Sequence, residues 1–324
     1  MNRLLIGGVA LAALIAGPAM AAEMPLKALA PAPAAISWTG WYIGLNAGYM
    51  WGQTRPGFLV DDSNAGYFTP LFVGLTTADL LAVQATGTTP FKNSGFTGGG
   101  QIGFNFQTGN IVSGVEVDFQ SFNPKGSNTP AGSYHSAGTP GAVCPATVAA
   151  CTLAFAQSSS GSWLNTDRVR VGIAWDKWLV YGTVGLAVAS LKFDSTFADT
   201  TTGATGAVPG LIFSGLRSAV SFNQTRVGVA AGGGLEYAFG PWSLRGEFLY
   251  VQIDRVGGDT LAVSNGALFG GAAAACSPVT VPGLTGLPSL GCPTFKYDVT
   301  LADFIVRAGI NYRFGWAEPV VARY

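Results

Sequence analysis

Six charged side chains lie inside segments of alternating apolar and polar residues, and they have the clearest capacity for chemistry. They are Glu116, Arg170, Glu236, Arg245, Glu247 and Arg307. Each falls on the polar side of a period of two, which is the period of a β-strand. Counting from the nearest predicted turns places all six at similar depth. We therefore expect acids and arginines to pair, because an unpaired buried charge costs several kcal/mol.

Three uses of these charges are open at this stage. A set of structural salt bridges would fill a narrow interior. A constricted hydrophilic path would instead let small solutes pass. Glycines on the inward side would leave space for such a path: Gly44, Gly48, Gly99, Gly103, Gly228 and Gly232. A catalytic pair of carboxylates fits least well, because carboxylates held by arginines stay ionised and are poor proton-transfer groups.

The four cysteines fall into two local pairs, Cys144 with Cys151 and Cys276 with Cys292. If the chain is exported to an oxidising compartment, we expect a disulfide within each pair, although the sequence alone permits three connectivities. Neither a Cys-x-x-Cys motif nor a nearby histidine accompanies them, so we do not expect zinc.

His135 is the single histidine, and Ser133 and Ser136 lie beside it. A His and a Ser near the outer rim could serve a lipid-modifying barrel enzyme, and a His could also bind haem. We predict His135 in the middle of a loop, without a strand to position it. We therefore expect no enzyme, no cofactor and no metal. The triple glycines at 98–100 and 232–234 are not followed by Lys-Ser/Thr, so they are not phosphate loops.

The composition narrows the class of protein. The 324 residues include 17 basic and 17 acidic side chains, which is 10% charged and a formal net charge of zero. Soluble domains contain about 25%. Without a basic stripe, nucleic acid is not an expected partner. Beyond residue 22 there is no apolar run long enough for a membrane-spanning helix, so a hydrophobic chain of this kind favours strands.

The N-terminal segment has the features of an export signal. Arg3 precedes an apolar run, and Ala19-Met20-Ala21 fits the cleavage rule. We expect a signal peptide at 1–21, a Pro/Ala-rich periplasmic leader at 22–37, a barrel at 38–314 and a periplasmic tail at 315–324. The Pro/Ala alternation of the leader opposes both helix and sheet.

Eight segments alternate with a period of two: 41–51, 96–107, 111–122, 163–175, 178–193, 222–239, 242–254 and 301–314. Three tight turns, at 108–110, 176–177 and 240–241, alternate with four long loops at 52–94, 123–161, 194–221 and 255–298. A short helix is expected at 76–85. The alternation predicts an all-β fold, an eight-stranded antiparallel transmembrane β-barrel with four long extracellular loops. Ten strands stay possible if part of the first loop extends the sheet.

The last strand shows the pattern most clearly. Its apolar side ends in aromatics, and Arg307 and Arg313 lie on the other side, as expected for lipid outside and a polar lumen inside. In the sixth strand, Arg226 is predicted to point inward with Glu236. When the eight strands are laid out in order as an up-and-down barrel, the aromatic residues fall into two girdles, one near each membrane interface. The turn side has Trp41, Trp175, Trp178, Trp242 and Trp316, and the loop side has Tyr49, Trp51, Phe96, Trp163, Phe193 and Tyr250.

Three stretches carry a family resemblance: WTGWYIGLNAGY (38–49), SLRGEFLY (243–250) and VRAGINYRF (306–314). With them, the chain resembles the small eight-stranded outer-membrane barrels of alphaproteobacteria, the opacity-protein-like porin family. The resemblance covers the strands and not the loops. In one respect the chain departs from the pattern, because ten residues follow Phe314 where such barrels usually end.

The resemblance implies a surface protein of the bacterial outer membrane. Its expected partners are outer-membrane lipid and lipopolysaccharide, the barrel assembly machinery, and an unidentified surface ligand or host contact. We expect a structural or interaction role through the loops. The alternatives are a passive diffusion channel for small hydrophilic solutes and, more remotely, a lipid-modifying barrel enzyme.

Overall fold

The computed structural model describes residues 36–61, 77–136, 150–200, 216–261, 263–264 and 294–315. The predicted signal peptide, the leader up to residue 35 and the tail from Trp316 onward lie outside these ranges. In the described part of the chain, no helix has the length and apolar character needed to cross a membrane.

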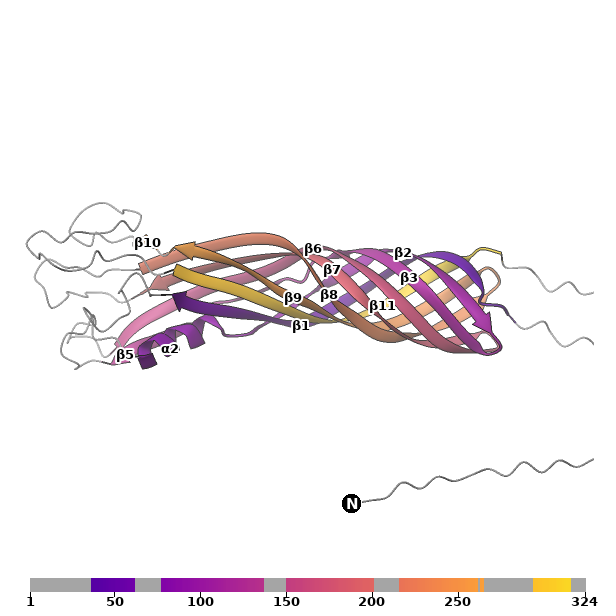
Figure 1. Ribbon diagram of the computed structural model, residues 1–324, viewed down its shortest axis with the longest axis horizontal. Coiled ribbons are helices and arrows are strands. Elements are labelled where there is room, and N and C mark those ends of the chain that lie inside the picture. Colours follow the sequence, from indigo (N-terminus) through magenta and orange to yellow (C-terminus); the bar gives the residue numbers. More distant parts are fainter. Residues whose placement is uncertain are drawn as a thin grey trace, which may run out of the picture. The chain divides into compact units, whose positions relative to one another are not determined.

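Eight long antiparallel strands form a closed ring, because β11 pairs with both β9 and β1 (Figure 1). The prediction of eight strands is thus confirmed. The ring consists of β1 (Gly40–Asp61), β2 (Phe91–Thr108), β3 (Ile111–Phe122), β6 (Ala150–Trp175), β7 (Trp178–Asp199), β8 (Leu216–Phe239), β9 (Trp242–Leu261) and β11 (Thr294–Arg313). Four short elements accompany it: α2 (Thr77–Gly87), β4 (Gly126–Asn128), β5 (Ala131–Ser136) and β10 (Val263–Ser264).

The three predicted tight turns lie at one end of the ring, which we call the turn end. They connect β2 to β3, β6 to β7 and β8 to β9, and each contains a residue with positive φ: Gly109 (60°), Asp176 (51°) and Gly240 (60°). β1 begins and β11 ends at the same end. The opposite end, where α2 and β5 lie, is the loop end (Figure 1).

The strands continue further toward the loop end than the sequence predicts. β1 extends to Asp61 instead of residue 51, β6 begins at Ala150 instead of 163, and β11 begins at Thr294 instead of 301. Much of the four predicted loops is therefore strand, and their predicted boundaries are wrong. The alternation persists there with polar residues outside and apolar residues inside, the reverse of the pattern in the predicted strands.

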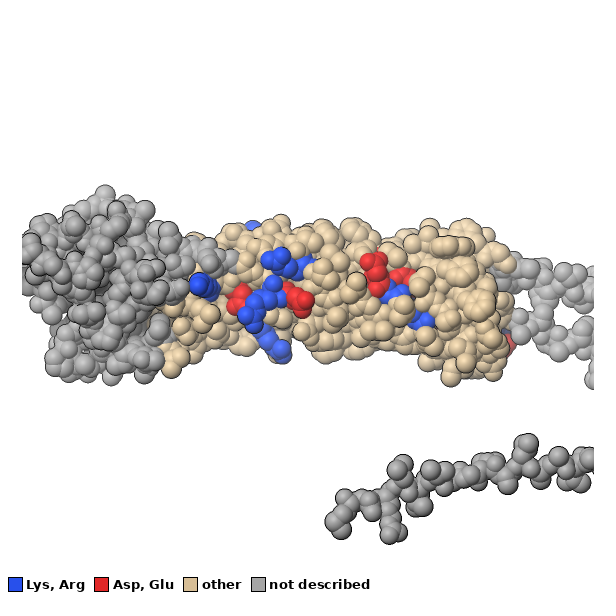
Figure 2. Space-filling view, in the orientation of Figure 1, with Lys and Arg blue, Asp and Glu red and all other residues tan. Residues whose placement is uncertain are grey.

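A belt of exposed apolar side chains surrounds the half of the barrel nearer the turn end. It includes Leu45 (67% exposed), Val184 (55%) and Leu244 (54%). Trp41 and Trp242 border the belt at the turn end, and Tyr49, Trp51 and Phe96 border it on the other side. On the face drawn in Figure 2, charged side chains gather mainly beyond the belt, with one smaller group over it. The bilayer therefore covers only this half.

Phe193 does not belong to the outer girdle. Its side chain is fully buried inside the barrel, where it packs against Phe222 with 5.4 Å between ring centroids. Its odd number in β7 places it on the same side as Leu191 and Phe197, which are also buried. The prediction was wrong because the apolar side of β7 changes from outside to inside beyond the belt.

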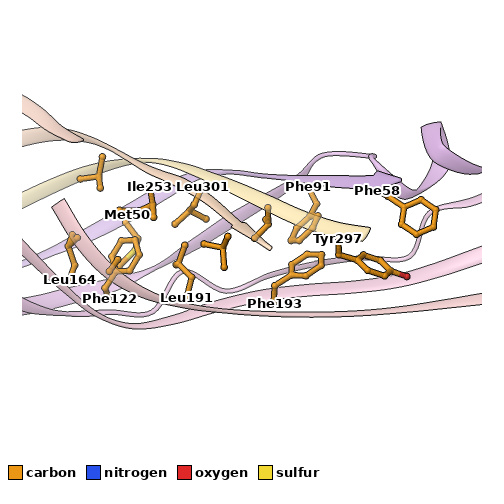
Figure 3. Packing of buried hydrophobic residues seen from close by; sticks show 14 of the residues in the cluster. Met50, Phe58, Phe91, Phe122, Leu164, Leu191, Phe193, Ile253, Tyr297 and Leu301 are labelled. Carbon is orange, nitrogen blue, oxygen red and sulfur yellow. The ribbon is translucent and has the colours of Figure 1, made fainter. Parts of the chain in front are cut away.

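The interior has three layers along the barrel axis. Trp38 heads a small apolar cluster at the turn end, with Val112, Leu179 and Ala238. A polar and charged layer follows. Toward the loop end, a large apolar cluster fills the barrel, and Figure 3 shows its side chains pointing inward from the surrounding strands. Phe58 lies at its far end, with ring centroids 5.0 Å from both Phe155 and Tyr297.

β8 and β9 separate beyond the belt. They pair only from Gly228 to Phe239 on β8, and the described part of β9 beyond Ile253 pairs with β11 alone. At this point Asp254 and Arg255 bulge opposite Thr300, because the register shifts between Val299 and Leu301. Across the seam, Gln224 Nε2 donates a hydrogen bond to the Gly257 carbonyl oxygen (2.9 Å).

The position of the membrane can be tested with one substitution at two heights. Val184 and Thr196 both point outward from β7, twelve residues apart. We expect Val184→Arg to lower the free energy of unfolding by about 2–4 kcal/mol, because it places a charge near the bilayer midplane. Thr196→Arg should change it by less than about 0.5 kcal/mol. Urea unfolding in lipid vesicles measures both, and equal losses would contradict the assigned belt.

Candidate functional site

Eight charged side chains from five strands meet in the lumen beneath the apolar belt. We call them the charged layer: Glu116 and Asp118 on β3, Arg168 and Arg170 on β6, Glu236 on β8, Arg245 and Glu247 on β9, and Arg307 on β11. None is more than 4% exposed. Four arginines face four carboxylates, so the layer has no formal net charge.

Strand register brings opposite charges together before any longer-range contact is made. Glu116 lies directly opposite Arg168 in the β3–β6 pair, and Glu247 lies opposite Arg307 in the β9–β11 pair. Glu236 and Arg245 are partners in the β8–β9 pair. Such cross-strand pairs are the local unit of sheet stabilisation. The charged layer is thus specified strand by strand.

Glu116 is the centre of the network. The Arg245 guanidinium binds both of its carboxylate oxygens, with Nη2 at 3.0 Å from Oε1. Arg168 donates to the same carboxylate from β6, and the Tyr42 hydroxyl donates from β1 (2.5 Å). A carboxylate held by two guanidinium groups and a phenol is fixed in position.

Arg307 joins two acids on opposite sides of the barrel. Its Nε donates to Glu247 Oε2 (2.6 Å) and its Nη2 to Asp118 Oδ2 (2.7 Å). Arg168 contacts the same two acids, with Nη2 at 2.6 Å from Asp118 and Nη1 at 3.2 Å from Glu247. These shared contacts tie β3, β6, β9 and β11 together across the lumen.

Arg170 and Glu236 form the ion pair of the charged layer that lies nearest the turn end. Their side chains meet at 2.9 Å, and Asn311 Nδ2 also donates to Glu236 (2.7 Å). The Arg170 guanidinium lies 3.9 Å from the centroid of the Tyr181 ring, which places the cation over the aromatic face.

The inward glycines do not leave an open path at this level, because neighbouring side chains occupy the space beside them. A Cβ at Gly103 would lie 2.3 Å from the Tyr42 hydroxyl, and a Cβ at Gly234 would lie 2.5 Å from the Tyr181 hydroxyl. The small residues therefore accommodate tyrosines that bind the charged layer.

The structure brings together all six charged residues named from the sequence and adds Asp118 and Arg168. Each of these two lies two residues from a named one on the same strand face, so the period of two contained the signal. Arg226, predicted to point inward, is exposed. The regular alternation of burial in β8 breaks at residues 225–227, where three consecutive side chains are exposed.

The other candidate residues lie mostly beyond the described part of the chain. Cys144, Cys276 and Cys292 fall outside it, and Cys151 is described only through the backbone of β6. The two expected disulfides therefore stay predictions. The prediction that His135 lies in the middle of a loop is wrong, because it belongs to β5, which pairs with β6.

Losing one partner should destabilise the charged layer far more than it destabilises an exposed ion pair. We expect Arg307→Met to lower the free energy of unfolding by about 3–5 kcal/mol, because it leaves buried carboxylates unpaired. The matched control is Arg255→Met, since Arg255 also binds an acid (Asp298, 2.7 Å) but is 77% exposed. Its cost should stay below about 1 kcal/mol. Similar costs in vesicle unfolding would refute the role of the layer.

Comparison with known proteins shows which proteins this chain is similar to. The chain is 31% identical over 252 residues to the 31 kDa outer-membrane immunogenic proteins of Brucella melitensis and Brucella suis, covering 76% of this chain and 85% of each relative. Among solved structures, it is similar to the outer membrane protease OmpT of Escherichia coli (9% identity, TM-score 0.35), covering 85% of this chain and 97% of that one. We infer nothing from so low a score.

The sequence profile of the outer membrane protein beta-barrel domain family matches residues 9–270. In such barrels the short turns face the periplasm, so the loop end is the extracellular end. The chain belongs to the outer membrane protein beta-barrel domain family, and it is an eight-stranded barrel of the bacterial outer membrane.

Proposed function

We propose that this protein is a closed surface barrel, which works through its extracellular half and does not conduct solutes. The observation that carries the proposal is the filled lumen. Three successive layers of buried side chains occupy it, and each draws on strands from around the ring. An eight-stranded barrel has an interior just wide enough for side chains to fill.

The periplasmic mouth is closed first. Trp38 is 1% exposed, and its backbone nitrogen donates to Gln107 Oε1 (2.7 Å). The Arg313 guanidinium lies 4.9 Å from the centroid of the Trp38 ring and donates to the Gly240 carbonyl oxygen (2.7 Å). The segment before β1 is thereby held across the opening.

The charged layer closes the middle of the lumen. A passing ion would have to break guanidinium–carboxylate pairs with no exposed side-chain surface, such as Arg168 with Asp118. Breaking one partner of a buried pair is costly. The apolar layer beyond it, with Met50, Leu249 and Ile305 at 0% exposed, offers an ion no polar groups in place of its hydration shell. The diffusion channel is therefore the less favoured function.

The extracellular half supplies a rigid surface. β6 has 26 residues and β7 has 22, and they pair from Trp175–Trp178 up to Leu153–Asp199. α2 packs mainly against β5 and β1 at the loop end, and its Val83 is buried in the large apolar cluster. A packed core this far above the membrane supports a role in contact with partners outside the cell.

We favour surface interaction over catalysis as the function of this protein. The Brucella relatives are named as immunogenic outer-membrane proteins, which supports a surface-exposed role without enzyme activity for this chain. Among its partners we propose the barrel assembly machinery and outer-membrane lipid. A lipid-modifying enzyme would need a second group held beside His135, whose side chain lies outside the described part of the structure.

Conductance tests the proposal directly. We expect the refolded protein to give no single-channel steps in a planar bilayer, and a known porin in the same bilayer gives the positive control. Folding is verified by a heat-dependent shift in gel mobility. Reproducible steps that change with Arg245→Ala or Glu247→Ala would show that solutes pass through the charged layer, and the closed-barrel proposal would then be wrong.

A further inference from the structure

A polar pocket opens on the outside of the barrel, above the apolar belt. Its volume is about 480 Å³, and it is lined by Lys92, Lys125, Gly126, Ser127, Ser158, Ser159 and Ser160. Both lysines are exposed. Neither forms an ion pair with a residue in the described ranges, so their charges are available to a ligand.

The pocket exists because β3 is shorter than its neighbours. β3 stops at Phe122. Beyond it, the three-residue β4 pairs with β6, and Lys125 forms an isolated bridge with Ser94 of β2. Gly126 of β4 must lack a side chain, since a Cβ there would lie 2.5 Å from the Lys92 carbonyl oxygen. The glycine therefore lets β4 approach β2 closely at the floor of the pocket.

The walls of the pocket are fixed by backbone hydrogen bonds. Lys125 and Ser94 exchange two of them, at 2.9 and 3.1 Å. On the other side, Ser127 pairs with Ser158 in the β4–β6 register. Ser160 lies opposite Lys192 of β7, so a third cation borders the site, 3.3 Å from Asp194.

The height of the pocket matches the lipid headgroups. Phe96 of the outer girdle is 79% exposed, and Lys92 lies four residues above it on the same side of β2. Four residues span about 13 Å along a strand, or about 10 Å along the bilayer normal at a tilt of about 40°. Trp163 and Phe119, stacked with centroids 5.7 Å apart, complete the girdle under the pocket.

We propose that this pocket binds the phosphorylated sugar headgroup of lipopolysaccharide, the glycolipid of the outer leaflet. The ammonium groups of Lys92 and Lys125 would donate charge-assisted hydrogen bonds to a phosphate. The hydroxyls of Ser127, Ser158 and Ser160 can donate to and accept from sugar hydroxyls. The acyl chains would lie against Phe96 and Phe119 below. The inference rests on the membrane position of the barrel and is independent of whether the lumen conducts.

The test is an equilibrium titration of the refolded full chain in detergent with deep-rough lipopolysaccharide, with bound lipid counted by native mass spectrometry. We expect Lys92→Ser/Lys125→Ser to weaken binding at least about tenfold, as the loss of charge-assisted hydrogen bonds implies. The matched control is Lys177→Ser/Arg226→Ser, which removes the same charge from two exposed positions elsewhere. It should bind within about twofold of the unmodified chain.

A second comparison needs no variant. Dephosphorylated lipopolysaccharide should bind the unmodified protein at least about tenfold more weakly than the phosphorylated form. Equal binding of the two lipids, equal binding by the pocket variant, or an equal loss in the control variant would each overturn the proposal. Displacement of the lipid by millimolar inorganic phosphate would assign the pocket to the free anion and would overturn the lipid assignment.

Discussion

A barrel of eight strands can hold charges in its lumen only if they balance, and this constraint organises the structure. The lumen is too narrow to hydrate four arginines, so each has to meet a carboxylate. The cross-strand pairs Glu116–Arg168 and Glu247–Arg307 satisfy part of this need through register alone. A slip of one residue in any of these strands would point the charges of that strand toward lipid. The charged layer therefore stabilises one register of the ring.

The rest of the molecule follows from what lies on either side of this layer. Outside it, the belt that ends at Trp51 and Phe96 fixes the height of the membrane. Beyond the belt the outer surface faces water instead of lipid. The apolar side chains of the strands therefore point inward there and form a water-excluding core around Phe58 and Phe155. The same barrel is thus a membrane protein in one half and resembles a soluble β-protein in the other.

The alternation of residues predicts the ring, the turns and the inward charges, because lipid on one side and a polar lumen on the other impose a strong period of two. The same alternation does not predict the strands beyond the belt. There the Ser158-Ser159-Ser160 run of β6 has the composition of a loop, yet Ser159 is buried and hydrogen-bonded to Thr54 (2.8 Å). Trp38 was expected at the start of the barrel, but its role in closing the mouth depends on Arg313, 275 residues away, and no local pattern shows this contact.

The most direct test of a charge-balanced lumen is a double-mutant cycle on Arg170 and Glu236, unfolded by urea in lipid vesicles. If the layer must stay neutral, Arg170→Met and Glu236→Met should each cost about 3–5 kcal/mol. The double variant should cost at least about 2 kcal/mol less than their sum, because it removes one charge of each sign. Strictly additive losses would contradict the account, since they would mean that the two charges are stabilised independently.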